Sequence, residues 1–246
     1  MPGKAAFCVG ERSLLGEPRP SRNAAMDERY YGTARTEILP WLPERVSRML
    51  DIGCGAGATT AAVKRVREVR WAGGVEYVDG VAAVAERDLD RVWRGDAAKA
   101  PLEATIAPRS LDLVLCLDVL EHMQDPWAMV RRLSELIGPG GRLIVSVPNI
   151  RHWKFIWRLA LRGDFAYRDA GLLDRTHLRF FVRRTAIELA TAGGLQLMAA
   201  VSAQAWRFPD PRWWLARASL GKLDEVMAKQ WLVVAERPVE PQARLA

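Results

Sequence analysis

The chain has 246 residues, of which 50% are hydrophobic and 26% are charged, a balance that suits one globular domain and excludes global disorder. No apolar run approaches the roughly 20 residues that a membrane-spanning helix requires. The net charge of +7 is concentrated in residues 151–184, which hold nine Arg and Lys residues against three Asp residues, so we expect an anionic partner near that segment.

Residues 1–25 are rich in Gly, Pro, Arg and Ser without periodicity, which predicts a flexible tail before a folded domain at 26–246 and makes Met26 a candidate start. The chain has only three cysteines, without a CxxC pair, and its N-terminus lacks the apolar core of a secretory signal. These features indicate a reducing, cytoplasmic setting.

Between residues 46 and 147, short apolar runs alternate with helical patterns, which predicts a doubly wound α/β domain with a seven-stranded, mostly parallel sheet. Strands are predicted at 48–52, 70–76, 91–95, 111–117 and 142–147. Before the last of these we expect a helix that Asp125 caps and that Gly138 with Pro139 ends. A helix at 185–192 and strands at 195–201 and 230–236 follow.

Two insertions interrupt this pattern, at 149–180 and 202–228, and the first is predicted to form a lid. Within it, apolar residues recur at helical spacing opposite a series of Arg and Lys residues, which predicts a basic amphipathic helix that includes Trp153 and Trp157. Three interpretations of this helix stay open. Its tryptophan face packs on the core, its basic face binds a phosphorylated or nucleotide-linked substrate, or it contacts a membrane surface.

A glycine-rich turn follows the first predicted strand, in the sequence Met-Leu-Asp-Ile-Gly-Cys-Gly-Ala-Gly at 49–57. Gly53, Gly55 and Gly57 let the backbone turn sharply and approach a ligand, and the next helix offers free N–H groups. Because Gly53, Gly55 and Ala58 also fit the GxGxxA pattern of dinucleotide sites, an NAD-linked oxidoreductase is an alternative at this point.

Three carboxylates at the ends of successive predicted strands favour another ligand. Asp51 lies just before the first glycine, where it repels a pyrophosphate and attracts an ammonium or sulfonium group. Glu76 ends the second strand and can accept both ribose hydroxyls. Asp96 follows the third strand and can accept from an exocyclic amine. The three together indicate an adenosine that carries a cationic amino-acid tail.

In these features the chain resembles the class I S-adenosylmethionine-dependent methyltransferases over residues 27–200, through LDIGCGAG, GGVE, GDA, LDLVLCLDVLEHMQDP and LIGPGGRLIVSVPN. The resemblance implies S-adenosyl-L-methionine as the cofactor, with the three glycines packed against it. It also implies that Glu76 binds the ribose, that Asp96 and Ala97 lie at the adenine, and that Asp118 with Asp51 lies near the methionine part.

Two shorter stretches extend the resemblance. Tyr31 and Arg35, in YYGTARTEIL, resemble the helix that closes over the cofactor in this family, with Arg35 a candidate for its carboxylate. VPNIRHW followed by GLLDRTHLRFF is similar to a bacterial subgroup linked to polysaccharide, glycolipid and antibiotic-sugar pathways. That similarity implies a sugar hydroxyl as the methyl acceptor.

The histidines of the first insertion are the predicted catalytic residues, because a general base assists transfer to a hydroxyl. His177 is the first candidate for this base and His152 the second. Asp174, Arg179 and Trp153 are predicted to contact the substrate. The spacing of His and Asp fits no recognised set of ligands, so we expect no metal.

The predicted function is therefore transfer of a methyl group from S-adenosyl-L-methionine to an oxygen of a small polar acceptor, with an anionic or nucleotide-linked sugar as one candidate. Alternatives are a catalytically silent regulatory protein that binds the same cofactor, and methyl transfer to nitrogen, carbon or nucleic acid. The sequence LDVL in the fourth motif disfavours nucleic acid, because it lacks the Asn/Asp-Pro-Pro-aromatic pattern that amino-methylating DNA enzymes resemble. The sequence does not indicate an oligomeric state.

Overall fold

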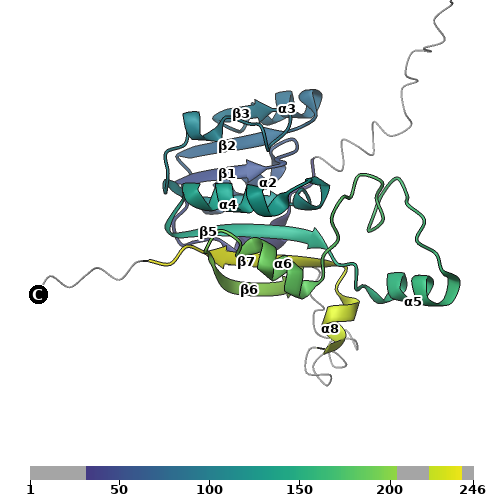
Figure 1. The fold of residues 1–246 in the computed structure, drawn as a ribbon. Coiled ribbons are helices and arrows are strands. Elements are labelled where there is room, and N and C mark those ends of the chain that lie inside the picture. The colour runs from purple at the N-terminus through teal and green to yellow at the C-terminus, as the bar shows by residue number, and fades with distance from the viewer. Residues whose placement is uncertain (1–31, 204–221, 240–246) are drawn as a thin grey trace, which may run out of the picture.

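The computed structural model describes residues 32–203 and 222–239 (Figure 1). The predicted tail, Tyr31 and most of the second predicted insertion lie outside the described residues. Within the described ranges, no helix is long and apolar enough to cross a bilayer.

Seven strands form one sheet in the order β3-β2-β1-β4-β5-β7-β6. The first five strands in the chain run parallel, and β7 runs antiparallel to both of its neighbours, β5 and β6. The predicted doubly wound, mostly parallel sheet is confirmed. The strands are β1 (Arg48–Ile52), β2 (Trp71–Glu76), β3 (Arg91–Arg94), β4 (Leu111–Leu117), β5 (Ile137–Pro148), β6 (Gln196–Ser202) and β7 (Gln230–Glu236).

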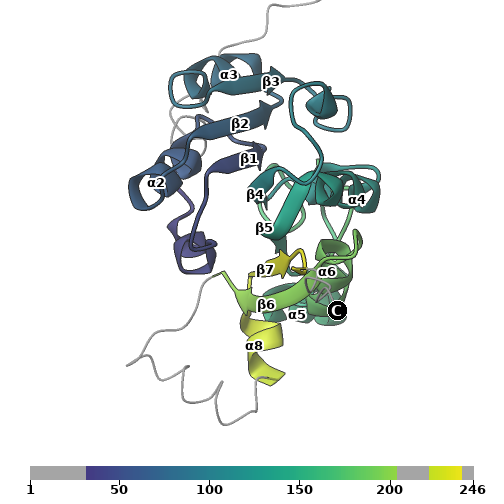
Figure 2. The same cartoon turned by 90° about the vertical axis from the view of Figure 1, so that its left-hand side faces the viewer.

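Helices cover both faces of the sheet, as the two views in Figures 1 and 2 show. On one face, a buried cluster that includes Leu133 and Leu189 joins two helices to the strands, and on the other, Ile38 and Val63 are fully buried. The first pair of helices is α4 (Pro126–Leu136) and α6 (Arg183–Ala190), and the second is η1 (Thr36–Trp41) and α2 (Ala58–Val66). Shorter helices are α3 (Asp79–Ala85), η2 (Leu102–Ala104), η3 (Leu120–His122) and α8 (Lys222–Met227).

The predicted start of α4 is confirmed, since the side chain of Asp125 accepts a hydrogen bond from the backbone N–H of Ala128 at 2.9 Å. The start of β5 was predicted five residues too late. Ile137 already pairs with Leu111 of β4, across an irregularity in the register, so the strand begins directly where the helix ends.

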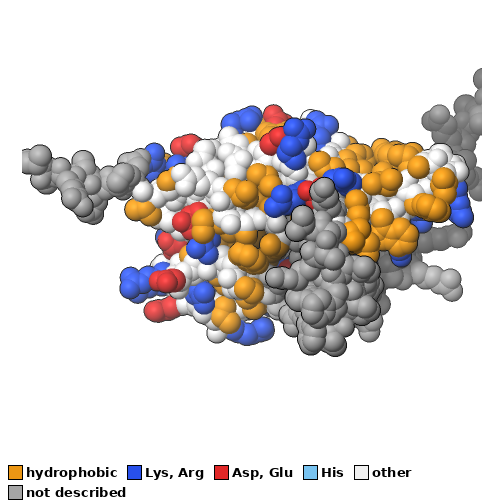
Figure 3. Space-filling view, turned by 90° about the horizontal axis from the view of Figure 1, so that it is seen from below, with side chains coloured by type: hydrophobic (Ala, Val, Ile, Leu, Met, Phe, Trp, Pro, Cys, Tyr) orange, Lys and Arg blue, Asp and Glu red, His pale blue; other side chains and the backbone are white. Residues whose placement is uncertain are grey.

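The first insertion leaves the sheet after β5 and returns before α6, and a bridge between Asn149 and Phe181 holds its two ends together (Figure 1). Its helix, α5 (Trp153–Arg162), forms as predicted. The apolar face of α5 is largely exposed, with Trp157 at 61% and Leu161 at 63%, and hydrophobic side chains gather on this part of the surface (Figure 3). The interpretation that this face packs on the core is therefore wrong for the described residues, and the role of a lid stays a prediction.

Candidate functional site

The predicted cofactor residues come together at the carboxyl ends of the parallel strands. Gly53 follows β1, Glu76 ends β2, Asp96 follows β3 and Asp118 follows β4. The strand order reverses direction at β1, which lies between β2 and β4. In open α/β sheets, ligands bind in the crevice at such a reversal.

The glycine-rich turn between β1 and α2 has no room for a side chain at Gly53 or Gly57. Gly53 and Gly57 have positive φ angles of 73° and 84°, which favour glycine. A Cβ atom on Gly53 would lie 3.0 Å from the side chain of Val119, and one on Gly57 would lie 2.9 Å from that of Leu89. The turn therefore packs tightly against Val119 and Leu89, and within it Gly53 is exposed at the end of β1.

Glu76 is fixed to this turn. Its side chain is buried, with 5% of the residue exposed, and its two oxygens accept hydrogen bonds from the backbone N–H groups of Gly55 and Val78, each at 2.9 Å. At the next strand, the carboxylate of Asp96 accepts from the N–H of Ala98 at 3.0 Å and is 44% exposed, while Ala97 is buried. The carboxylate of Glu76 is thus fixed by two backbone hydrogen bonds, whereas that of Asp96 is open to solvent.

Asp51 lies behind the turn, with 2% of the residue exposed, and its carboxylate accepts a hydrogen bond from the hydroxyl of Thr60 at 3.0 Å. Burial raises the pKa of Asp51 to about 7, the charge of Glu76 adds to this, and the bond from Thr60 opposes it. The structure places this side chain as a support for α2, beneath the surface on which a ligand would lie.

A pH dependence of stability follows from this raised pKa. The folded chain holds a proton on Asp51 that the unfolded chain releases near pH 3.8, so the stability that this proton provides is present below that pH and is lost as the pH rises to about 7. Asp51→Asn stays neutral, and we expect its stability relative to the parent to rise by about 1–3 kcal/mol from pH 5 to pH 8. Urea unfolding of both chains without ligand at the two pH values measures this, and a constant difference would contradict it.

Asp118 has a positive φ of 58°, rare for a residue with a side chain. Its carboxylate accepts hydrogen bonds from Ser146 at 3.0 Å, from Gln230 and from the guanidinium of Arg35, which also bonds Glu37 at 2.5 Å. Strain of this kind persists where the surroundings fix the conformation and is frequent at functional sites. Arg35 and Asp118 are thus brought together, whereas Tyr31 lies outside the described residues.

Sequence reasoning missed Ser146 and Gln230. Ser146 lies near the end of β5 and Gln230 opens β7, and the amide of Gln230 also accepts from Arg35 at 3.1 Å. Ser146 lies within the LIGPGGRLIVSVPN stretch, but nothing in that stretch marks it as a partner of Asp118. Gln230 lies in none of the motifs, and only the pairing of β7 with β5 brings it to this edge.

A second cluster lies beside Asp118, where Glu121, His122 and His177 each offer one atom within 4.8 Å of the others. The carboxylate of Glu121 is buried, with 1% of the residue exposed, and neither oxygen has a hydrogen-bond partner in the part of the chain that the structure describes. Burial, followed by the charge of Asp118, raises the pKa of Glu121 well above its usual range. Among the described residues, this is the group whose spacing could hold a metal ion, and the expectation of no metal stays a prediction.

His177 has a defined tautomer in this cluster. Its Nδ1 lies 3.0 Å from the carbonyl oxygen of Leu172, which can only accept, so Nδ1 carries the proton and Nε2 is free to accept one. Its ring packs edge-on against that of His122, with centroids 4.8 Å apart. Burial, followed by the charge of His177, lowers the pKa of His122.

The predicted substrate residues Asp174 and Arg179 lie next to this cluster but are occupied by local bonds. Asp174 accepts from the N–H and the hydroxyl of Thr176 at 2.8 and 2.7 Å. The N–H of Arg179 donates to the carbonyl of Glu121 at 3.0 Å, and its guanidinium bonds the carbonyl of Gln124.

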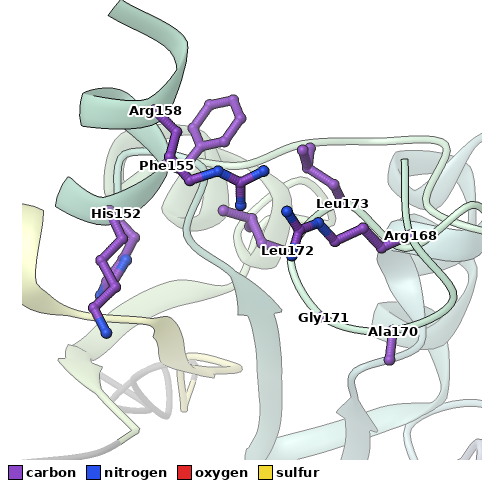
Figure 4. A pocket seen from close by; sticks show the side chains of 9 residues that line it. His152, Phe155, Arg158, Arg168, Ala170, Gly171, Leu172 and Leu173 are labelled. Atoms are coloured by element: carbon purple, nitrogen blue, oxygen red, sulfur yellow. The ribbon is translucent and has the colours of Figure 1, made fainter. Parts of the chain in front are cut away.

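His152 and Trp153 lie elsewhere, at the start of α5. His152 lines a cavity beneath that helix (Figure 4). Trp153 is 43% exposed. His177, in contrast, lines a separate hollow with Tyr167, Arg175 and Leu178. The structure does not bring the two predicted catalytic histidines into one site.

Comparisons with known proteins add to this geometry. Residues 23–200 match the family described as "Methyltransferase domain". A ubiquinone biosynthesis O-methyltransferase from Xylella fastidiosa (strain M23) is 28% identical over 174 residues, which are 64% of this chain and 69% of that protein.

Two solved structures show the same fold. An S-adenosylmethionine-dependent methyltransferase from Mesorhizobium loti has a TM-score of 0.56 and 18% identity, over 84% of this chain and 100% of that one. Phosphoethanolamine N-methyltransferase 2 from Haemonchus contortus, in complex with S-adenosyl-L-methionine, has a TM-score of 0.59 and 16% identity. The match covers 94% of this chain and 61% of that one.

Proposed function

The chain belongs to the family of methyltransferase domains that use S-adenosyl-L-methionine, and on this basis we propose that it methylates a hydroxyl oxygen of a small polar acceptor. We choose oxygen as the methyl-accepting atom because Nε2 of His177, in the cluster beside Asp118, is free to take up the proton of a hydroxyl. The names of the curated relatives, which are O-methyltransferases, support the same choice.

The residues at the edge of the sheet fit the cofactor. The turn at 53–57 has glycine where a Cβ atom would collide with Val119 or Leu89, so its sharp backbone turn at the end of β1 depends on glycine, and Glu76 is held beside it, where it can accept from ribose hydroxyls. Asp96 with Ala97 would bind the adenine, and Arg35 would bind the carboxylate. When bound, S-adenosyl-L-methionine supplies a methyl group on a positively charged sulfur, open to in-line attack by an oxygen.

His177 would take up the proton of the acceptor hydroxyl at Nε2. A hydroxyl is a poor nucleophile while protonated, and a positioned base accelerates such steps by typically ~10²- to 10⁴-fold. The bond from Nδ1 to the carbonyl of Leu172 holds the ring in the tautomer that this role needs. His122, which packs against it, and Glu121 would position the ring.

Two classes of acceptor are supported by different observations. A sugar hydroxyl is favoured by the VPNIRHW and GLLDRTHLRFF stretches and by the cationic residues of the first insertion. A hydroxylated precursor of ubiquinone is the second candidate, because the relatives are named for ubiquinone biosynthesis.

Methyl-labelled S-adenosyl-L-methionine tests these proposals directly. The purified chain is incubated with nucleotide-linked and phosphorylated sugars in one series, and with hydroxylated ubiquinone precursors in another. We expect label in a methyl ether of a sugar. Transfer to the ubiquinone precursors alone would replace the sugar with the second candidate, and label on nitrogen or carbon would contradict transfer to oxygen.

A further inference from the structure

A cavity of about 250 Å³ lies between α5 and the loop at 168–173. We call it the basic cavity. It is lined by His152, Lys154, Phe155, Arg158, Arg168 and residues 170–173. The guanidinium groups of Arg158 and Arg168 converge from opposite sides above Leu172 (Figure 4).

The charge of the basic cavity is unbalanced. Only Arg158 has an ion pair, with Asp164 at 2.5 Å, and no carboxylate of the described ranges lies within ion-pair distance of Lys154 or Arg168. Three permanent cations therefore line the cavity against one carboxylate, and the ammonium of Lys154 also lies 5.7 Å from the centre of the Trp153 ring. Burial, followed by the charges of Lys229 and Lys154, lowers the pKa of His152, as expected where positive charge surrounds an imidazole.

The cavity is held by backbone bonds before any ligand arrives. The N–H of Arg168 donates to the carbonyl of Leu173 at 2.8 Å, and the carbonyl of Arg168 accepts from the N–H of Arg175 at 3.0 Å. The same loop reaches the proposed base, because the carbonyl of Leu172 accepts from His177. A ligand in the basic cavity would thus lie against the segment that orients His177.

We propose that the basic cavity binds a phosphate group carried by the methyl acceptor. Two converging guanidinium groups match the geometry of phosphate oxygens, and Lys154 adds a point charge. The side chains of Phe155, Leu172 and Leu173 offer an apolar wall to the organic part of the same molecule. This assignment rests on the proposed function for the identity of the molecule as the acceptor.

The test uses inorganic pyrophosphate as the probe. The full chain is titrated at constant ionic strength while the imidazole resonances of its three histidines are followed by NMR. We expect saturable binding that raises the pKa of His152, and a loss of affinity of about tenfold or more in Arg168→Gln, because charge-assisted hydrogen bonds disappear. Arg184→Gln removes the same charge from α6, where that side chain is 84% exposed, and should leave the affinity unchanged.

Three outcomes overturn the assignment: no saturable binding, equal loss of affinity in both variants, or binding to phosphatidylglycerol vesicles without binding to pyrophosphate. The last would assign the cations and the exposed tryptophans of α5 to a membrane surface. Binding of S-adenosylhomocysteine is measured on the same samples. A chain that binds S-adenosylhomocysteine but not pyrophosphate contradicts only the basic cavity, and the reverse result contradicts the proposed function.

Discussion

His177→Ala is expected to lower the rate of methyl transfer by about 10²- to 10⁴-fold, while the affinity for S-adenosyl-L-methionine stays nearly unchanged. The imidazole would accept the acceptor proton at Nε2, which the bond from Nδ1 to Leu172 leaves free. Its neighbours are Glu121 and His122, and none of the residues proposed to hold the cofactor bonds to it. Single-turnover rates with labelled cofactor, together with calorimetry, separate the two effects.

Two controls sharpen this experiment. His152→Ala removes the other predicted base from the lining of the basic cavity, so it is expected to raise the KM for the acceptor, while the single-turnover rate at saturating acceptor stays near that of the parent. Addition of EDTA tests whether Glu121, His122 and His177 instead hold a metal. Activity that is lost in EDTA and restored by a divalent cation would replace the general base with a metal site, and an unchanged rate in His177→Ala would remove this residue from the mechanism.

Glu76→Ala should weaken binding of S-adenosylhomocysteine by about 10²- to 10⁴-fold. Its carboxylate is the proposed partner of the ribose hydroxyls, and hydrogen bonds to a charged group contribute roughly 1.5–3 kcal/mol each. The substitution also leaves the N–H groups of Gly55 and Val78 without their present acceptor, so the glycine-rich turn loses its anchor. Calorimetry measures the affinity, and thermal unfolding shows that the variant is folded.

Glu68→Ala provides the matched control, because this glutamate is 88% exposed and lies away from the glycine-rich turn. It should bind S-adenosylhomocysteine like the parent. If Glu76→Ala also binds with parental affinity while it is folded, the ribose is held by other residues.

The sheet and its cofactor edge could be predicted because their determinants are local. Apolar runs mark buried parallel strands, Asp125 and Pro126 mark a helix start, and glycines mark a turn that excludes side chains. The start of β5 escaped prediction, since Gly138 and Pro139 suggest a break in the chain while the pairing of Ile137 with Leu111 extends the strand across it.

The rest of the site depends on contacts between distant parts of the chain. Glu121 lies in the LDLVLCLDVLEHMQDP stretch, but nothing in that stretch shows that its carboxylate is buried, which follows from the return of the first insertion over η3. Periodicity correctly predicted α5, but helical spacing alone does not say whether an apolar face is covered. In the structure it is exposed, which contradicts one of the three interpretations of this helix, that its tryptophan face packs on the core.

The pairing of β7 with β5 brings a late part of the chain to the candidate cofactor site at the carboxyl ends of the parallel strands. The side chain of Gln230, the first residue of β7, donates to Asp118. Just before this strand in the chain, the carbonyl oxygens of Glu225 and Ala228 accept hydrogen bonds from the side-chain amide of Asn149, each at 2.8 Å. A fusion partner attached after residue 239 would spare these bonds. A truncation before Gln230 would remove an interior strand and one of the three side chains that donate to the carboxylate of Asp118.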